Sequence, residues 1–261
     1  MPEPESVFSA GSTQYPSYDD AGATAAYVTT DRGTDWLLGH FFVFEALGLP
    51  TLGAGKVLDF GCGPGAVADF AARRFGVRVL ATDVAPAMLE MARKRGTPDV
   101  EYHQLTEGRA VGLPDACADA AMCSFVLTAV PAIEGLRTAL SEIRRLMKPG
   151  ARLAILGTDP DCLGMSFTSV EPGEPGVNYQ TGDVVPVRLR TVDGAWQQFT
   201  NYYWPLSVYE NLLAEAGFSG IEQHRPTVDQ AESVADPELF HSSEWAAEQA
   251  CPPLIIITAD A

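Results

Sequence analysis

The chain has 261 residues, of which 46% are hydrophobic, and it carries a formal net charge of −17 at pH 7. This length suits one large domain or one domain with a substantial insertion. The negative charge would repel phosphate backbones and anionic lipid, so it disfavours nucleic acid and membrane surfaces as partners and favours a small molecule. We expect a cytoplasmic protein, because no apolar run approaches the length of a membrane span and the first residues are acidic rather than basic and apolar.

Five cysteines and four histidines are scattered along the chain. The cysteines form no C-x-x-C pair, and their odd number gives no disulfide framework. The histidines lie far apart in the sequence. The pattern therefore predicts neither a disulfide scaffold nor a metal site.

The first fifty residues differ in character from the rest of the chain. Residues 1–20 are polar and contain Ser, Pro and one Gly, so we expect a flexible arm. Residues 21–28 and 34–47 then show the apolar spacing of helices. We expect residues 1–50 to form an N-terminal arm and a helical lid.

A glycine-rich stretch is the most informative part of the chain. Residues 56–65 read Lys-Val-Leu-Asp-Phe-Gly-Cys-Gly-Pro-Gly, which predicts a buried strand followed by a loop through Gly61, Gly63 and Gly65. The loop opens into a helical pattern. Glycines let backbone amides approach a ligand closely, and the N-terminus of the helix points free N–H groups at it. A small-molecule site is therefore expected here.

Two acids narrow the choice of ligand. Asp59 lies two residues before the first glycine, where it would repel a pyrophosphate but could accept hydrogen bonds from an ammonium group. Asp83 follows the β-rich run 77–82, where a carboxylate can accept both hydroxyls of a ribose. The alternative is a nicotinamide or flavin dinucleotide site, since residues 61–66 also fit G-x-G-x-x-A. Asp59 argues against that alternative.

The elements alternate between strand and helix through the middle of the chain, which predicts a parallel sheet with right-handed crossovers and ligands beyond the carboxyl ends of the strands. The expected strands are 56–60, 77–82, 99–104, 119–127, 152–157 and 253–259. The expected helices are 65–75, 86–95, 133–147 and 208–216.

The segment 159–206 is unusually long for a connection in this pattern. Two alternating runs, 185–191 and 195–203, flank Val192-Asp193-Gly194 and predict a β-hairpin. The second run is rich in aromatic residues, which argues against disorder. We expect this insertion to cap a substrate pocket, with a dimer interface as the alternative.

The motifs in residues 52–160 resemble those of the class I S-adenosylmethionine-dependent methyltransferases. The resemblance implies a Rossmann-like, mostly parallel seven-stranded sheet flanked by helices, whose last strand runs antiparallel and inserts beside strand five. With the N-terminal lid and the hairpin insertion, four parts are expected: 1–50, 51–158 as the cofactor-binding core, 159–206 as the substrate cap, and 207–261 as the completion of the core.

The resemblance also assigns cofactor-binding residues. Asp59 and the loop residues Gly61, Cys62, Gly63 and Gly65 would hold the methionine part of S-adenosylmethionine, and Asp83 would hold its ribose. Val84 and Met88 would offer an apolar wall to the adenine. The chain departs from the family pattern after strand three, where Thr106 or Glu107 is the expected adenine contact. Ser124 would lie beside the methyl group, with simple strand packing as its alternative.

Three residues are candidates for a part in the transfer itself. Tyr27 could close over the cofactor and stabilise the sulfonium with its ring face, with simple packing or solvent exposure as the alternative. Glu107 is an acid after strand three, with a solvated loop acid as the alternative. His224 could act as a base, although a lone histidine is more often structural or exposed.

The expected activity is methyl transfer to a nitrogen or carbon of a small heteroaromatic secondary metabolite, in antibiotic biosynthesis, with S-adenosylhomocysteine as the product. The insertion and the segment Asn-Tyr-Tyr-Trp-Pro loosely resemble those of bacterial natural-product enzymes that methylate nitrogen or carbon of heteroaromatic rings. That resemblance implies an azapteridine, indole or diketopiperazine acceptor. The alternatives are an O-methyltransferase of a small phenolic or carboxylic metabolite, and a non-methylating S-adenosylmethionine-binding protein such as a pericyclase. Either a monomer or a homodimer is compatible with the sequence.

Overall fold

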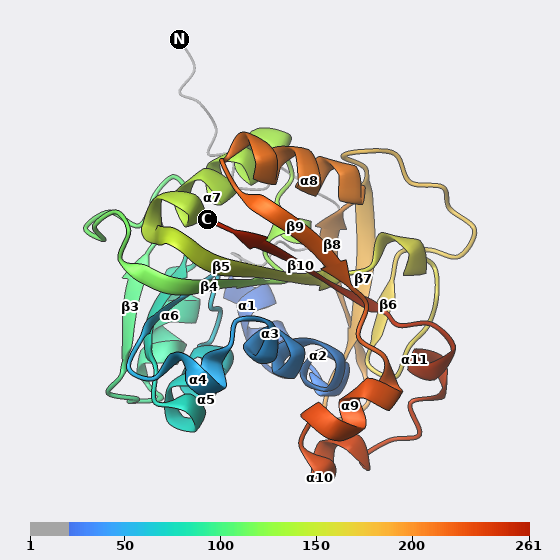
Figure 1. The fold of residues 1–261 in the computed structure, drawn as a ribbon. Coiled ribbons are helices and arrows are strands. Elements are labelled where there is room, and N and C mark those ends of the chain that lie inside the picture. The colour runs from blue at the N-terminus through green and yellow to red at the C-terminus, as the bar shows by residue number, and fades with distance from the viewer. Residues whose placement is uncertain (1–20) are drawn as a thin grey trace.

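Seven strands lie side by side in the order β3-β2-β1-β4-β5-β10-β9, in a computed structural model that describes residues 21–261 (Figure 1). Neighbouring strands among β1 to β5 are parallel, whereas β10 is antiparallel to both β5 and β9. The strands are β1 Lys56–Phe60, β2 Arg78–Asp83, β3 Val100–Gln104, β4 Ala118–Ser124, β5 Met147–Thr158, β9 Ser219–His224 and β10 Leu254–Asp260. The expected mostly parallel, seven-stranded sheet with an antiparallel last strand is confirmed.

The central strands are apolar because helices cover both faces of the sheet (Figure 1). Helices α7 (Ile133–Leu146) and α8 (Leu206–Glu215) pack on one face. Helices α3 (Phe41–Ala46), α5 (Ala66–Phe75) and α6 (Pro86–Arg93) pack on the other. Each helix buries one apolar stripe and leaves the opposite side in solvent.

The N-terminal helices are shorter and more broken than the sequence predicts. Helix α1 is Ala21–Tyr27, as expected. The expected single helix 34–47 consists instead of α2 (Gly33–Asp35), a π-helical turn η1 (Trp36–His40) and α3, followed by α4 (Leu49–Leu52). Within η1, the ring of Trp36 packs against the ring of His40 at 4.9 Å. The predicted flexible arm, residues 1–20, lies outside the described residues.

The hairpin of the insertion is present and belongs to a second, three-stranded antiparallel sheet of order β6-β7-β8 (Figure 1). Strands β7 (Val184–Arg190) and β8 (Trp196–Tyr202) match the two predicted runs within one residue. Strand β6 (Val170–Pro172) was not predicted, since a three-residue strand ending in proline has too little periodicity to detect. A 3₁₀ turn η3 (Pro160–Cys162) connects β5 to this part.

Two further differences have local causes. The expected strand 119–127 ends at Ser124 because Phe125 has a left-handed φ of +59°, and a 3₁₀ turn η2 (Leu127–Ala129) follows. The short helices α9 (Val228–Val234), α10 (Pro237–Phe240) and α11 (Ala246–Ala250) were not predicted. Among the helices of residues 21–261, none has the length and apolar character needed to cross a bilayer.

Candidate functional site

The glycine loop between β1 and α5 is bound tightly to the end of β2. The amides of Gly61 and Cys62 both donate to the carbonyl of Thr82, at 2.7 and 2.8 Å. Gly61 has φ +80°, and a Cβ placed on it would lie 2.1 Å from the Cγ2 of Val126. Only glycine can therefore occupy this position without moving Val126.

The other two glycines of the loop have different surroundings. Gly63 has φ +52°, and a Cβ on it would meet no atom within 4 Å, so this residue faces open space. Gly65 begins α5 with φ +77°, and its Cβ would meet Ala92 at 2.8 Å. Gly65 thus lets α5 pack closely against α6, whereas Gly61 and Gly63 line a hollow next to the loop.

Asp83, the last residue of β2, holds the loop from the opposite side. Its Oδ2 accepts a hydrogen bond from the amide of Gly63, and its Oδ1 accepts one from the amide of Ala85, both at 2.8 Å. Burial raises the pKa of this carboxyl, and the backbone amides oppose that rise. Each carboxylate oxygen can accept a second hydrogen bond, so Asp83 keeps acceptor capacity for a ligand.

Asp59 is buried without a protein partner for its Oδ2. Burial, reinforced by the negative charge of Asp83, raises the pKa of Asp59 to about 7. A buried carboxylate oxygen without a donor is costly unless a ligand satisfies it. An ammonium group in the adjoining hollow would supply both the missing donor and the missing positive charge.

This hollow, which we call the loop hollow, lies between the glycine loop and the N-terminal helices. Its lining includes Asp59, Cys62 and Gly63 from the loop side and Arg32, Trp36 and His40 from the other side. His40 is buried, its Nδ1 has no partner, and burial together with the charge of Arg32 lowers its pKa to about 3. His40 is therefore neutral at physiological pH and offers polar ring atoms without charge.

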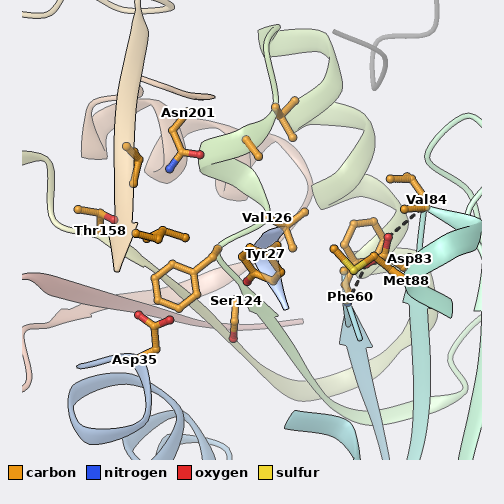
Figure 2. Close-up of a pocket in the computed structure, with 18 of the residues that line it drawn as sticks. Tyr27, Asp35, Phe60, Asp83, Val84, Met88, Ser124, Val126, Thr158 and Asn201 are labelled. Carbon is orange, nitrogen blue, oxygen red and sulfur yellow. Dashed lines mark hydrogen bonds between the residues drawn. The ribbon is translucent and has the colours of Figure 1, made fainter. Parts of the chain in front are cut away.

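A second cavity continues from the loop hollow along the carboxyl ends of the strands, and we call it the main cavity. Six residues line both spaces: Tyr27, Arg32, Gly61, Gly63, Ser124 and Phe125. Figure 2 shows Phe60, Asp83, Val84 and Met88 gathered at one end, Asp35, Thr158 and Asn201 at the other, and Tyr27, Val126 and Ser124 between them. Polar groups thus occupy both ends of a mostly apolar space.

The far end of the main cavity is closed by the insertion. Val170, Val187, Leu189 and Asn201 from the second sheet line it, and the Oδ1 of Asn201 is buried without a partner. The remaining walls are apolar groups from η2, its neighbours and β10, which are Val126, Ala129, Val130, Pro131 and Leu254. An apolar space with one unpaired amide oxygen suits a flat, mostly apolar molecule that carries a hydrogen-bond donor.

The N-terminal segment and the insertion meet over this cavity. The amide of Asp31 donates to the carbonyl of Arg190 at 2.6 Å, and the amide of Val192 donates to that of Thr29 at 2.9 Å. The ring of Tyr27 meets the ring of Phe199 edge-on, with 6.0 Å between their centroids. These contacts join two segments that are about 160 positions apart into one wall.

The predicted site residues separate into two groups. Asp59, Gly61, Cys62, Gly63, Asp83, Val84, Met88, Ser124 and Tyr27 all line one or both of the spaces. Thr106 and Glu107 are exposed on a turn, where the amide and carbonyl of Thr106 pair with those of Arg109. His224 is exposed at the end of the edge strand β9, and its ring lies 5.9 Å from that of Phe42.

The structure brings Leu105 into the main cavity in place of its neighbours Thr106 and Glu107. It places none of Gly65, Thr106, Glu107 and His224 among the residues that line the loop hollow or the main cavity. Their roles in cofactor binding and in transfer stay predictions without support from the lining of either space.

Sequence reasoning missed the charged pair Arg32 and Asp35. The Nε of Arg32 donates to the Oδ2 of Asp35, and the guanidinium lies 4.7 Å from the ring centroid of Tyr27. Burial raises the pKa of Asp35, and Arg32 opposes that rise. The sequence shows that Arg32 and Asp35 are three positions apart, but this spacing is equally typical of side chains that cap an ordinary helix.

Comparisons with known proteins agree with this geometry. Residues 58–155 match the family described as "Methyltransferase domain". The chain is 34% identical over 194 residues to N-demethylindolmycin N-methyltransferase of Streptomyces griseus, an alignment that covers 72% of this chain and 81% of that protein.

Solved structures show the same fold at low sequence identity. An S-adenosylmethionine-dependent methyltransferase from Mesorhizobium loti superposes with a TM-score of 0.54 at 20% identity, covering 81% of this chain and 93% of that one. The [4+2]-cyclase SpnF superposes with a TM-score of 0.51 at 20% identity, covering 85% and 78%. The family match, the relative from Streptomyces griseus and the site geometry together show that the chain belongs to the class I S-adenosylmethionine-dependent methyltransferases.

Proposed function

We propose that the chain transfers the methyl group of S-adenosylmethionine to a nitrogen or carbon of a small heteroaromatic secondary metabolite. The observation that carries this proposal is the main cavity, whose apolar walls continue directly from the cofactor end at Asp83 and Met88 to the unpaired amide of Asn201. A relative that is named for N-methylation of N-demethylindolmycin favours nitrogen as the acceptor atom. The same relative supports a role in antibiotic biosynthesis.

The cofactor fits the residues that are present. The unpartnered Oδ2 of Asp59 would accept from the ammonium group of the methionine part, with the open face of Gly63 beside it. Asp83 would accept from the ribose hydroxyls, and Val84, Met88 and Leu105 would enclose the adenine. The bound cofactor supplies an electrophilic methyl group on sulfur.

Arg32 is the new candidate for the carboxylate of the cofactor. Its guanidinium lines the loop hollow, faces Asp35 with Nε and has further N–H groups that could reach a second carboxylate. Tyr27, beside the guanidinium, lines both spaces at their junction. This position is consistent with its proposed role next to the sulfonium.

The acceptor would lie in the part of the main cavity that is lined by the insertion. Transfer needs an in-line approach of acceptor atom, methyl carbon and sulfur at about 3–3.5 Å, with water excluded. The apolar walls from η2 and the second sheet exclude water, and Asn201 would fix the orientation of the ring through one hydrogen bond. The net charge of −17 supports a small molecule over a nucleic acid as the acceptor.

The proposal is tested by incubating the purified protein with S-adenosylmethionine and a panel of indole, azapteridine and diketopiperazine compounds, including N-demethylindolmycin. Mass spectrometry should find an acceptor that gains one methyl group with formation of an equal amount of S-adenosylhomocysteine, and NMR should place that methyl on nitrogen or carbon. The control is Asp83→Ala, which should bind the cofactor about ten- to a hundredfold more weakly and lose transfer at low cofactor concentration.

Other outcomes discriminate the alternatives. Methylation of a phenol or carboxylate, with none of the heteroaromatics accepted, would favour an O-methyltransferase. Cofactor binding without S-adenosylhomocysteine formation, together with conversion of an unmethylated substrate, would favour a pericyclase.

A further inference from the structure

Two cysteines that are far apart in the sequence lie in contact beside the main cavity. Cys162 ends η3, and Cys251 follows α11. Their Sγ atoms are 2.9 Å apart although 89 positions separate them in the chain. This pair is outside the cofactor site and has no part in the proposed transfer.

The backbone around the pair is held by regular contacts. Strands β5 and β10 pair with Thr158 opposite Leu254, and the amide of Asp159 donates to the carbonyl of Pro253 at 2.9 Å. The Sγ of Cys162 also lies 3.2 Å from the carbonyl oxygen of Pro252. Both cysteines are thus anchored within a few residues of one strand pair, which keeps the two thiols together in the folded protein.

The two thiols differ in access. Cys162 is buried, with 1% of its surface exposed, among Phe167, Tyr179 and Val185. Cys251 is only partly buried and packs against the same cluster. A small oxidant can therefore reach Cys251 first, and Cys162 is placed to react with whatever Cys251 has bound.

We infer that Cys162 and Cys251 form a redox modification site that takes a low-molecular-weight disulfide such as oxidised glutathione. The thiolate of Cys251 attacks one sulfur of the oxidant, forms a mixed disulfide and releases one glutathione thiolate. The thiol of Cys162, whose pKa burial raises, then loses its proton, attacks the Sγ of Cys251, forms the intramolecular disulfide and releases the second glutathione thiolate. Two protein thiols are oxidised and one glutathione disulfide is reduced, with both thiol protons passing to solvent.

The bridge would act on the acceptor side of the protein. Thr158 and Leu254, the paired residues next to the cysteines, both line the main cavity. A disulfide would fix the start of the insertion to the chain that enters β10. We expect the disulfide to stabilise the insertion side of the main cavity. Cofactor binding should not change, because Asp59 and Asp83 belong to β1 and β2, whereas the cysteines lie next to β5 and β10.

The test titrates the full-length protein with mixtures of reduced and oxidised glutathione, followed by acid quenching, denaturation and alkylation. The wild-type protein should lose two of its five alkylatable thiols together, and peptide mapping should find residues 162 and 251 joined. The oxidised form should melt about 5–10 °C higher than the reduced form, since the bridge closes a long loop. Calorimetry should give the same S-adenosylmethionine affinity for both forms.

Matched variants separate this site from unspecific oxidation. Cys251→Ser should keep all four of its remaining thiols reduced, whereas Cys162→Ser should retain a glutathione adduct on Cys251. Cys117→Ser, whose cysteine precedes β4, should form the bridge as the wild type does. Five alkylatable thiols in the wild type at every glutathione ratio, or a mixed disulfide on wild-type Cys251 that never resolves, would overturn the inference even if a variant failed to fold.

Discussion

Asp59 carries a buried carboxylate whose pKa is raised to about 7 by burial and by the charge of Asp83 on the neighbouring strand. The two acids differ in their partners. Each carboxylate oxygen of Asp83 accepts a hydrogen bond from a backbone amide, whereas the Oδ2 of Asp59 accepts no hydrogen bond. Asp59 is therefore the acid whose charge depends on the ligand, and Asp83 is the acid that shapes the loop.

This difference predicts how cofactor binding depends on pH. An ammonium group favours ionised Asp59, so below pH 7 the cofactor must displace a proton from the site. Affinity should fall by up to about tenfold for each pH unit between 7 and 5.5, because the raised pKa of Asp59 lies at the top of that window. Calorimetric titration of S-adenosylmethionine at several pH values measures the slope.

Asp59→Asn is the control, since it keeps the shape of the side chain and removes the titration. This variant should bind more weakly at pH 7 and lose most of the pH dependence. A deaminated cofactor analogue should lose less affinity than S-adenosylmethionine on this substitution. Equal losses for the two ligands would show that Asp59 has only a structural role at the strand end.

A second prediction concerns the contact between Gly61 and Val126. In Gly61→Ala the new Cβ would meet the Cγ2 of Val126 at 2.1 Å, with the backbone at φ +80°. The left-handed backbone costs about 1–2 kcal/mol, and the overlap roughly 1–3 kcal/mol more. Chemical denaturation should show this loss in the free energy of unfolding, and calorimetry should show weaker cofactor binding.

The matched comparison is Gly63→Ala, whose Cβ would meet nothing within 4 Å at φ +52°. This variant should lose only the about 1–2 kcal/mol of unfolding free energy that a left-handed backbone costs an alanine, with no loss from steric overlap. Adding Val126→Ala to Gly61→Ala should recover part of the loss by making room for the methyl group. If the double variant is as unstable as the sum of the two single ones, steric overlap is not the cause.

The cofactor half of the fold could be predicted from the sequence because local chemistry fixes it. A buried strand, three glycines and an acid at each strand end specify the loop, the helix and the direction of the sheet within a few residues. The predicted bounds of helices and strands are wrong where a local change in backbone conformation interrupts a regular pattern of apolar residues. The π-helical turn at Trp36–His40 and the left-handed Phe125 interrupt patterns that read as continuous helix and strand.

The acceptor half could be predicted only in outline. The hairpin was visible from its alternating residues and its turn. The positions of Arg32, Asp35 and Asn201 in one cavity depend on tertiary contacts between the N-terminal segment and the insertion, such as Asp31 with Arg190. No periodicity or motif encodes a contact between segments about 160 positions apart, so these residues were missed.

Asn201 gives a prediction for the acceptor side. Replacing it with Leu removes a buried amide oxygen that has no protein partner, so the free energy of unfolding should change by less than about 1 kcal/mol. The kcat/KM for the acceptor should fall about three- to tenfold, as expected for one lost hydrogen bond. Steady-state kinetics with the acceptor identified in the panel measures this, and the cofactor affinity should not change.

Thr200→Val is a matched control for that substitution. The hydroxyl of Thr200 is also buried without a partner, but neither the main cavity nor the loop hollow includes this residue in its lining. Since it neighbours Asn201 on β8, its side chain points to the other face of the strand. Equal kinetic losses in the two variants would assign the effect to the strand rather than to a contact with the acceptor.

The last prediction separates the two roles available to Arg32. Arg32→Met removes the group proposed to bind the cofactor carboxylate and also leaves Asp35 without its cation. The affinity for S-adenosylmethionine should fall about tenfold or more, and the protein should lose roughly 1–3 kcal/mol of stability. Decarboxylated S-adenosylmethionine should be affected much less, because it lacks the group that Arg32 would contact.

Adding Asp35→Leu to Arg32→Met resolves the stability effect, since the double variant leaves no unpaired carboxylate. Its free energy of unfolding should return toward the wild-type value while its affinity for S-adenosylmethionine stays low. Recovery of both quantities in the double variant would mean that Arg32 serves only to neutralise Asp35. Persistent loss of affinity for the carboxylated ligand alone would place Arg32 in direct contact with the methionine end of the cofactor.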